Sequence, residues 1–477
     1  MKKYISACLL AGFMTVWSSC STNPVTGKKD VILMSEGQEL AMGKEADPQI
    51  VAQFGMYDNP ALQKFIDQKG QQMAAISHRS NIKYNFKILD SPVLNAFAVP
   101  GGYVYFTRGI MAHFNNEAQF AGVLGHEIGH IAARHSAQQQ SKSILAQVGL
   151  IAGMIISPEL AQFGDAASQG LGLLFLKFGR DDERESDRLG VEYSTKIGYD
   201  AAEMADFFLT LQRKQEESGA AIPEFLSTHP DPGNRYTTVQ QLASDWKQKV
   251  GLQNPEVNRN NYLKMIDGII YGEDPKQGFV EGGVFYHPEL KFQFPVPSNW
   301  GYQNTPQMFQ MAPKDGSAIM NLTLAAGNSL QEAAQQLMQN YQLTPVQSGN
   351  VTVNGLPAMA VIADQKQEQG TIRTLTYLIQ YGGNIYSIMG ISSEQNFNTY
   401  AQLFSNTMEG FRQLTDASKL NKQPERVRIK TVKQTGTLAQ ALQTYTKESK
   451  RLEEFAVLNG MKLQDRVEQG MLIKVVE

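Results

Sequence analysis

Cysteine is nearly absent from this chain, as are long apolar runs and any large excess of one charge. Of 477 residues only Cys8 and Cys20 are cysteines, which excludes a disulfide-stapled scaffold. The formal net charge is −3, so nothing indicates a nucleic-acid partner. The longest internal apolar stretch, Ile144–Ile156, is too short to cross a bilayer. We expect it to form a core helix or a helix that touches a membrane surface.

The first twenty residues are organised like a bacterial export signal. Two lysines precede an apolar run from residue 4 to 17, and Ser18-Ser19-Cys20 follows. We interpret residues 1–19 as a signal peptide. The ending resembles the lipoprotein signal, although Trp17 stands where an aliphatic residue is usual. Because cleavage would leave Cys20 as the one thiol, we predict that it is lipidated. The expected location is periplasmic, anchored to the outer membrane of a bacterial envelope; the alternative is an ordinary cleaved signal.

The pentapeptide His126-Glu127-Ile128-Gly129-His130 is an HExxH motif. Because four residues make just over one helical turn, both imidazoles leave the same side of a helix and can share one zinc ion. Asn116 is placed to cap this helix. Glu127 falls on its apolar stripe, where a carboxylate is costly unless it is paired or used. The motif indicates zinc-assisted hydrolysis of an amide bond; the alternative is a helix whose polar side chains are merely satisfied.

Two histidines leave a catalytic zinc site without its usual third protein ligand. A third histidine six residues after His130 is ruled out by Ser136, and His135 would be turned about 140° away on a continuous helix. The remaining source is the acidic segment 180–190. There Glu183 and Asp187 are spaced i, i+4, so one could bind metal while the other orients a ligating histidine. Spacing alone does not choose the metal ligand among Asp181, Asp182, Glu183 and Glu185.

Four blocks of the chain occur in an order that resembles one peptidase family. They are residues 95–109, the HExxH helix, Glu183-x-x-x-Asp187 followed by Arg188-Leu189-Gly190, and residues 228–235. Together they resemble the HExxH zinc peptidases of the HtpX and CAAX-prenyl-protease type, in particular their soluble, secreted BepA-like branch. Ser186 is a departure, since the family usually has alanine there. The resemblance implies a mainly helical, zincin-like domain in which Glu183 is the third ligand and Asp187 supports a ligating histidine.

His229 gains a specific interpretation from the same resemblance. In the BepA-like branch the corresponding histidine approaches the metal from a loop, blocks the water site and holds the enzyme latent. The alternative is an ordinary histidine–proline turn. In the resulting mechanism one Zn2+ per chain is held by His126, His130 and Glu183, and Glu127 is the general base. Arg235 or His229 is the candidate for stabilising the oxyanion.

The segment before the HExxH helix has the pattern of β-structure. Ile82, Tyr84, Phe86 and Ile88 alternate as in a strand, and Pro100-Gly101-Gly102 predicts the turn of a hairpin within residues 95–107. A strand beside the metal could bind an extended peptide at a sheet edge. An ordinary core hairpin accounts for the apolar pattern equally well.

After residue 255 the composition changes, and a linker is expected near residues 271–278. Short apolar strands and two helical patterns, near 329–341 and 394–411, predict an accessory α+β domain over residues 275–415, with an antiparallel sheet and helices on one face. Residues 425–477 have the order strand, helix, helix, strand and resemble LysM, a glycan-binding fold. Gly436-Thr437 departs from that signature, and the alternative is a small packing module without a ligand.

We therefore predict an α+β multidomain protein, with a mainly helical zinc metallopeptidase domain containing a small sheet over residues 20–255. The predicted function is a zinc endopeptidase that cleaves misfolded or misassembled cell-envelope proteins as quality control. Its expected partners are these unfolded proteins, a membrane through the lipid on Cys20, and peptidoglycan, with no nucleic acid. The alternative is an envelope chaperone, assembly factor or peptidoglycan-associated binding protein in which proteolysis is secondary.

Overall fold

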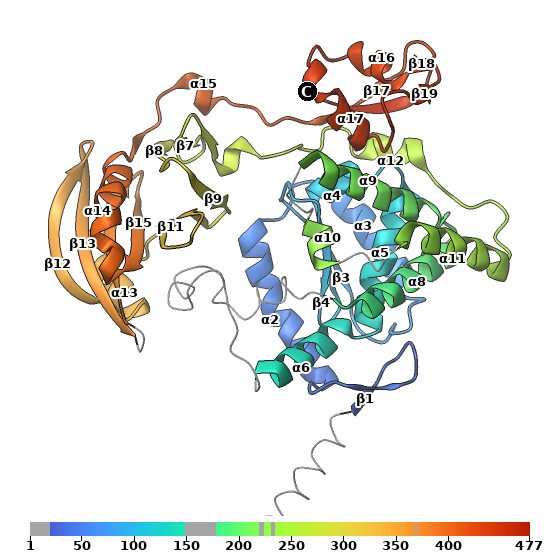
Figure 1. The fold of residues 1–477 in the computed structure, drawn as a ribbon, viewed down its shortest axis with the longest axis horizontal. Helices are drawn as coiled ribbons and strands as arrows, with labels where there is room; N and C mark the ends of the chain where they lie inside the picture. The colour runs from blue at the N-terminus through green and yellow to red at the C-terminus, as the bar shows by residue number, and fades with distance from the viewer. Residues whose placement is uncertain (1–19, 148–177, 219–223, 230–233, 368–369) are drawn as a thin grey trace, which may run out of the picture.

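The computed structural model describes residues 20–147, 178–218, 224–229, 234–367 and 370–477. Within these ranges the chain is a mixed helix-and-sheet protein built from several parts (Figure 1). None of the helices in these ranges is long and apolar enough to cross a membrane. The apolar stretch 144–156 lies largely outside the described residues; its first residues end helix α6, His135–Gln147.

The first part is mainly helical and surrounds a three-stranded sheet of order β3-β5-β4. A two-stranded hairpin, β1 (Cys20–Thr22) with β2 (Lys29–Val31), precedes it. The helices of this part are α2 (Glu36–Phe54), α3 (Pro60–Ala74), α4 (Arg108–His113), α5 (Glu117–Ala132), α6, α8 (Arg180–Lys196), α9 (Glu203–Ser218), α10 (Glu224–Thr228), α11 (Arg235–Val250) and α12 (Arg259–Met265).

Helix α5 carries the HExxH motif and is buried along almost its whole length, so the predicted helix is confirmed. The Asn116 side chain caps it by accepting the backbone N–H of Gln119 at 2.8 Å. Helix α8 packs against α5 where both have glycine, and a Cβ built on Gly125 would lie 2.9 Å from the carbonyl oxygen of Gly190. This close approach brings the acidic residues of α8 within reach of the two histidines.

The predicted hairpin is also present. Strands β4 (Ala96–Val99) and β5 (Tyr103–Thr107) pair antiparallel, and the turn between them uses Gly101 and Gly102 at φ of 83° and 93°. The strand expected at 82–88 is shorter and shifted, since β3 spans Asn85–Leu89 and runs parallel to β5. Strand β4 is an edge of the sheet and packs against α5.

The accessory part contains a seven-stranded antiparallel sheet of order β12-β13-β14-β15-β11-β10-β9 and a four-stranded sheet of order β16-β8-β7-β6. The strands predicted there are confirmed. The first sheet comprises β9 (Trp300–Asn304), β10 (Met308–Pro313), β11 (Ala318–Leu324), β12 (Thr344–Val353), β13 (Leu356–Gln367), β14 (Gly370–Tyr381) and β15 (Asn384–Ser393). The second comprises β6 (Phe279–Glu281), β7 (Val284–His287), β8 (Phe292–Pro295) and β16 (Arg412–Gln413).

The two main helices of this part lie on opposite faces of the large sheet, so the prediction of helices on one face is wrong. Met359 of β13 packs with Leu337 of α13 (Leu330–Asn340). The neighbouring residue Ala358 belongs to the cluster of Phe404 on α14 (Glu394–Glu409). Because successive residues of a strand point to opposite faces, these contacts place one helix on each side. Apolar residues therefore occur on both faces of β13, which is the sequence feature that accompanies a helix on each side.

The C-terminal part has the predicted order strand, helix, helix, strand. Strand β17 (Val427–Thr431) pairs antiparallel with β20 (Leu472–Val476), and α16 (Leu438–Gln443) and α17 (Leu452–Leu458) lie between them in sequence. A short pair, β18 (Gly436–Thr437) with β19 (Arg466–Val467), completes it. Its buried residues belong to the same apolar cluster as those of α5. The C-terminal part therefore packs as an integral piece of the mainly helical first part.

Candidate metal centre

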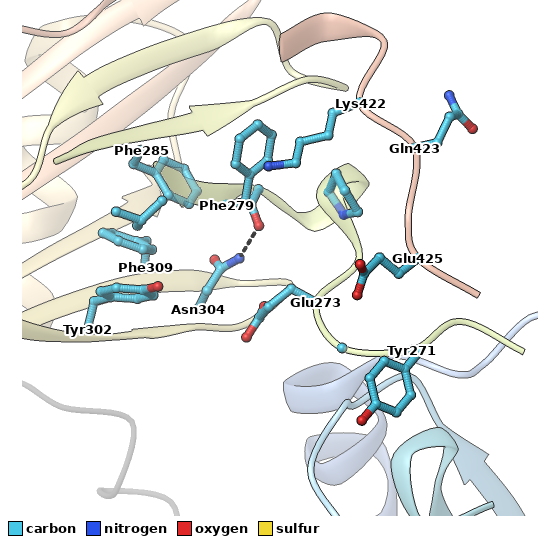
Figure 2. A pocket seen from close by; sticks show the side chains of 14 residues that line it. Tyr271, Glu273, Phe279, Phe285, Tyr302, Asn304, Phe309, Lys422, Gln423 and Glu425 are labelled. Carbon is cyan, nitrogen blue, oxygen red and sulfur yellow. Dashed lines mark hydrogen bonds between the residues drawn. The ribbon is translucent and has the colours of Figure 1, made fainter. Parts of the chain in front are cut away.

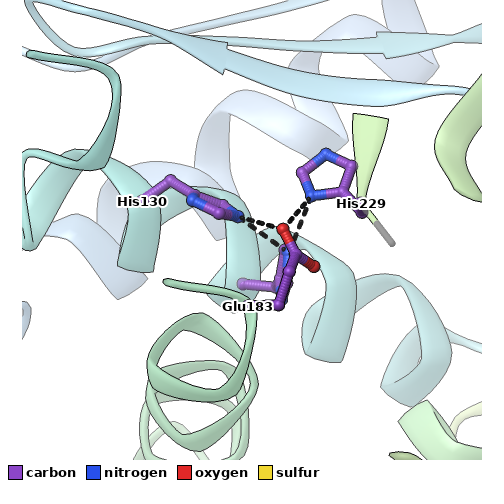
Figure 3. Close-up of side chains that lie close together, drawn as sticks. His130, Glu183 and His229 are labelled. Carbon is purple, nitrogen blue, oxygen red and sulfur yellow. Dashed lines mark hydrogen bonds and ion pairs between the residues drawn. The ribbon is translucent and has the colours of Figure 1, made fainter. Parts of the chain in front are cut away.

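Four buried side chains converge between α5, α8 and the end of α10 (Figure 3). His126 and His130 come from α5, Glu183 from the first turn of α8, and His229 follows directly after α10. Each offers one ligand atom, and these atoms all lie within 4.8 Å of one another. All four residues have an exposed fraction of 0%. Three histidines and a carboxylate so placed form a donor set of the type that binds zinc.

The distances within the cluster fit a cation at its centre. His126 Nε2 lies 3.0 Å from His130 Nε2 and 3.2 Å from His229 Nδ1. Glu183 Oε1 lies 3.0 Å from His229 Nδ1 and 3.5 Å from His130 Nε2. A tetrahedral zinc ion with bonds of about 2.0–2.1 Å would separate its ligand atoms by about 3.3–3.5 Å. Burial lowers the pKa of His130 well below its usual value, which favours the neutral imidazole that metals bind.

Glu127 lies beside this cluster without a hydrogen bond among the described residues. Both carboxylate oxygens are buried and accept no hydrogen bond, and His229 Nε2 lies 3.7 Å from Oε1. Burial raises the pKa of Glu127. A carboxylate is costly to bury in this state. Its position is explained if it handles protons on the face of the metal centre.

Asp187 and Arg235 support His126 from behind. Asp187 Oδ1 lies 2.9 Å from His126 Nδ1, and Arg235 donates to both Asp187 oxygens, from Nε at 2.8 Å and from Nη2 at 2.7 Å. Although burial opposes ionisation, the Arg235 charge and these hydrogen bonds lower the pKa of Asp187 to about 2. The guanidinium also stacks 3.9 Å from the ring centre of Phe208. Arg235 thus binds Asp187 through two hydrogen bonds. The role of Arg235 in stabilising an oxyanion stays a prediction.

The structure separates the carboxylates that spacing left open. Glu183 points into the cluster. Asp182 caps α8 by accepting the Gly179 backbone N–H at 3.0 Å, and the Asp181 side chain is 91% exposed. Glu185 Oε2 lies 3.2 Å from His135 Nε2. Of the four, Glu183 alone contributes to the four-residue cluster.

His135 lies closer to the cluster than its position in the sequence predicts. The angle of about 140° assumes a continuous helix, but α5 ends at Ala132 and Arg134 has a positive φ of 60°. The chain reverses there, and His135 Nδ1 comes within 3.0 Å of His130 Nδ1. It lies outside the ligand group, yet it contacts a member of that group. No local pattern signals a left-handed arginine, so this contact could not be found from the sequence.

Phenylalanine rings flank two of the histidines. Phe178 stacks on His130 with ring centres 4.0 Å apart. Phe225, one helical turn before His229, stacks on that ring at 4.5 Å, and the His229 backbone N–H donates to the Phe225 carbonyl at 2.8 Å. The direction in which His229 points is therefore fixed by α10 itself.

A separate hollow of about 260 Å³ lies where the chain enters and leaves the accessory part (Figure 2). Five of its fourteen lining residues are aromatic, and Lys422 Nζ lies 4.1 Å from the ring centre of Phe279. Its lining contains no histidine, cysteine or serine. Among the described residues the group of possible metal ligands lies at the other site, so the metal centre is the stronger candidate for chemistry.

Comparison with known proteins agrees with this geometry. Residues 60–243, which contain α5 and α8, match the model of Peptidase family M48. The chain carries a peptidase family M48 domain. The predicted family resemblance is thereby confirmed.

Two named relatives illustrate the match. The chain is 29% identical over 269 residues to the Beta-barrel assembly-enhancing protease of Escherichia coli (strain K12), covering 52% of this chain and 54% of that protein. It is 27% identical over 231 residues to the Mitochondrial metalloendopeptidase OMA1 of Arabidopsis thaliana, covering 48% of this chain and 45% of that protein. The chain thus spans about half the length of these relatives.

Proposed function

We propose that this M48 protein is a zinc-dependent endopeptidase. The observation that carries the proposal is the cluster of His126, His130 and Glu183 next to a buried Glu127 that has no hydrogen bond among the described residues. A structural cluster would be expected to satisfy that carboxylate. The names of the relatives, a protease and a metalloendopeptidase, support the same activity.

In this mechanism the residues divide the work. His126, His130 and Glu183 would hold zinc, which when bound would supply Lewis-acid chemistry for polarising a carbonyl and acidifying water. Glu127 accepts a proton from the attacking water and delivers it to the leaving amine. The raised pKa of Glu127, caused by burial, suits a group that must both take up and release a proton. Asp187 keeps the Nε2 of His126 directed at the metal by accepting its Nδ1 proton.

The proposal includes a latent state controlled by His229. Its Nδ1 contacts both His126 Nε2, at 3.2 Å, and Glu183 Oε1, at 3.0 Å. If His126, His130 and Glu183 held zinc, His229 would be a fourth protein donor at the site where hydrolysis needs a water. The His–Pro turn remains as an alternative, but it does not account for contacts to two other members of the cluster. Cleavage would then require α10 to withdraw His229.

The substrates we propose are extended segments of misfolded or misassembled envelope proteins. Strand β4 is a sheet edge that packs against the HExxH helix, and an extended peptide can add to such an edge. A folded protein has few segments available for this pairing. The E. coli relative is named for β-barrel assembly, which supports envelope proteins as the substrate class. The competing proposal is a chaperone or assembly factor that binds the same segments without needing to cut them.

We place the protein in the bacterial periplasm, attached to the outer membrane by a lipid on Cys20. The support is the signal-like sequence of residues 1–19, which lies outside the described residues, and the single thiol that follows it. Intact-mass analysis of the membrane-extracted protein tests this step. A mature chain that starts at Cys20 without added acyl mass would refute it.

We also propose that residues 425–477 contact peptidoglycan as a LysM-like module. The order of β17, α16, α17 and β20 supports the resemblance. Its shared core with the peptidase part favours the alternative, a packing module. Co-sedimentation of the full chain with purified sacculi distinguishes the two, and recovery in the supernatant would exclude peptidoglycan binding.

The central experiment combines metal analysis with peptide cleavage. The purified protein should contain about one zinc per chain, and casein cleavage should stop with a chelator and return with zinc. Glu127→Gln should retain zinc and lose hydrolysis. A Glu127→Gln protein that still cleaves casein would refute the proposed mechanism. If this variant instead supports envelope-protein assembly as well as the parent, the chaperone function is the primary one.

A further inference from the structure

His130 has an outer nitrogen whose partner is unusual. Its Nε2 faces the cluster, 3.0 Å from His126 Nε2. Its Nδ1 faces away from the cluster and lies 3.0 Å from His135 Nδ1. When a neutral histidine binds metal through one nitrogen, the other nitrogen carries the proton and needs an acceptor. The acceptor available to His130 is another imidazole.

One arrangement of protons satisfies every group along this line. If His130 donates from Nδ1, then His135 must accept at Nδ1 and carry its own proton on Nε2. That nitrogen lies 3.2 Å from Glu185 Oε2, a carboxylate that accepts. The Ser186 hydroxyl also lies 3.2 Å from His135 Nδ1. These contacts are consistent with a chain of hydrogen bonds from His130 to His135 and from His135 to Glu185.

We propose that His135 is a positioning residue for the metal centre, which accepts the Nδ1 proton of His130 and donates its own Nε2 proton to Glu185. It thereby fixes the ring orientation and tautomer that direct His130 Nε2 to the metal. The proposal rests on the proposed zinc site. It gives His130 a counterpart to the Asp187 carboxylate that serves His126.

The backbone conformation of Arg134 brings His135 next to His130. Arg134 has a left-handed backbone at φ of 60°, a conformation that is uncommon for residues other than glycine. Its side chain is held by Glu39 of α2, with Nε 2.8 Å from Oε2. Arg79 holds the same carboxylate at 2.6 and 3.0 Å. This buried cluster fixes the reversal after α5 and directs the first residue of α6 back toward His130.

Zinc affinity of the full chain, measured by competition with a chromogenic chelator, tests the proposal. His135→Leu keeps a buried apolar volume and removes the acceptor, and it should weaken zinc binding about 10- to 100-fold. His135→Gln offers an amide oxygen to His130 and an amide N–H to Glu185, so it should bind within about fivefold of the parent. Thermal unfolding of the zinc-free proteins shows whether each variant is folded.

His113→Leu is the matched control. His113 is also a buried histidine whose Nδ1 makes a hydrogen bond, to the Gly109 carbonyl at 2.8 Å, but it lies outside the cluster. Its replacement should leave zinc affinity within about twofold of the parent. If His135→Leu does not fold, Glu185→Ala replaces it, because the Glu185 side chain is 19% exposed. That variant should weaken zinc binding by about threefold to tenfold.

Each outcome separates this inference from the proposed function. A parent protein that binds no zinc overturns the metal site itself. A parent that binds zinc, with a folded His135→Leu that binds equally well, overturns only the role of His135. Equal losses in His135→Leu and His135→Gln also overturn it, because packing would then explain both. If Glu185→Ala is used in place of His135→Leu, a zinc affinity equal to that of the parent likewise overturns the role of His135.

Discussion

Lys474 Nζ, in the last strand of the chain, lies 2.9 Å from the carbonyl oxygen of Ala112 at the end of α4. It also donates to the carbonyls of Phe114 at 3.0 Å and His113 at 3.3 Å. The side chain is fully buried, and burial lowers its pKa well below the usual value. These carbonyls stand just before Asn116, the cap of the HExxH helix. The C-terminal part thus supplies a hydrogen-bond donor to the carbonyls at the end of α4, just before the HExxH helix begins.

Replacing Lys474 by methionine should therefore destabilise the peptidase part. The variant keeps the apolar stem but leaves three buried carbonyls without this donor, and the free energy of unfolding should fall by about 2 kcal/mol or more. Denaturant unfolding measures the change. Lys430→Met is the control, because Lys430 pairs with Glu477 at the surface and should change stability by less than about 0.5 kcal/mol. Equal stability of the Lys474→Met protein and the parent would show that the contacts of Lys474 do not stabilise the packing of the C-terminal part.

The HExxH helix, the hairpin and the accessory strands could be predicted because their signals are local. Asn116, the apolar spacing of α5 and the glycines after Pro100 act within a few residues of their effect. Glu183 needed the family resemblance, because Asp181 and Asp182 have the same chemistry. Their different positions depend on helical phase, and Asp181 simply faces solvent.

The contacts that escaped prediction depend on distant parts of the chain. His135 reaches His130 because Arg134 is held in a left-handed conformation by Glu39, 95 residues earlier. Lys474 meets Ala112 across 362 positions. In the accessory part, successive apolar residues of β13 point to opposite faces of the sheet. One set packs with α13 and the other with α14. In each case tertiary packing decides between locally equivalent options.

Asp187→Asn should weaken both metal binding and stability. The amide oxygen of the new side chain could still accept from His126, but the buried Arg235 would lose the carboxylate to which it donates two hydrogen bonds and keep only the longer 3.5 Å contact to Glu183. We expect zinc affinity to fall about 10- to 100-fold and the free energy of unfolding to fall by about 3 kcal/mol. Zinc competition and denaturant unfolding measure the two effects. Asp181→Asn, on the exposed side of the same helix, should change neither; matching losses in both variants would argue against the assigned role.

His229→Ala should raise the rate of casein cleavage if His229 holds the protein latent. Removing the ring vacates the fourth position of the cluster while His126, His130 and Glu183 remain. Zinc should bind more weakly, because one of four donors is lost, so the assay needs excess zinc. Ser227→Ala, on the same short helix α10, should keep the parental rate. Unchanged or lower cleavage by a zinc-loaded His229→Ala protein would exclude the latch.

Acid should destabilise the peptidase part through His113, starting below its ordinary pKa of about 6.5. Burial is the main reason that the pKa of His113 falls to about 3 in the folded protein. Between these values the unfolded chain binds a proton that the folded chain does not, so stability is lost as the pH falls. From pH 7 to pH 5 the loss attributable to His113 should be about 2 kcal/mol.

The measurement is denaturant unfolding of the metal-free parent and of His113→Leu at several pH values. The variant lacks the titrating ring, so its stability should fall less between pH 7 and pH 5, by about 2 kcal/mol. His287, whose pKa burial lowers to about 4, titrates in both proteins and cancels in the comparison. The two curves should become parallel below pH 3, where folded His113 also takes up its proton. Curves that are parallel throughout would mean that water or a rearrangement stabilises the protonated ring inside the fold.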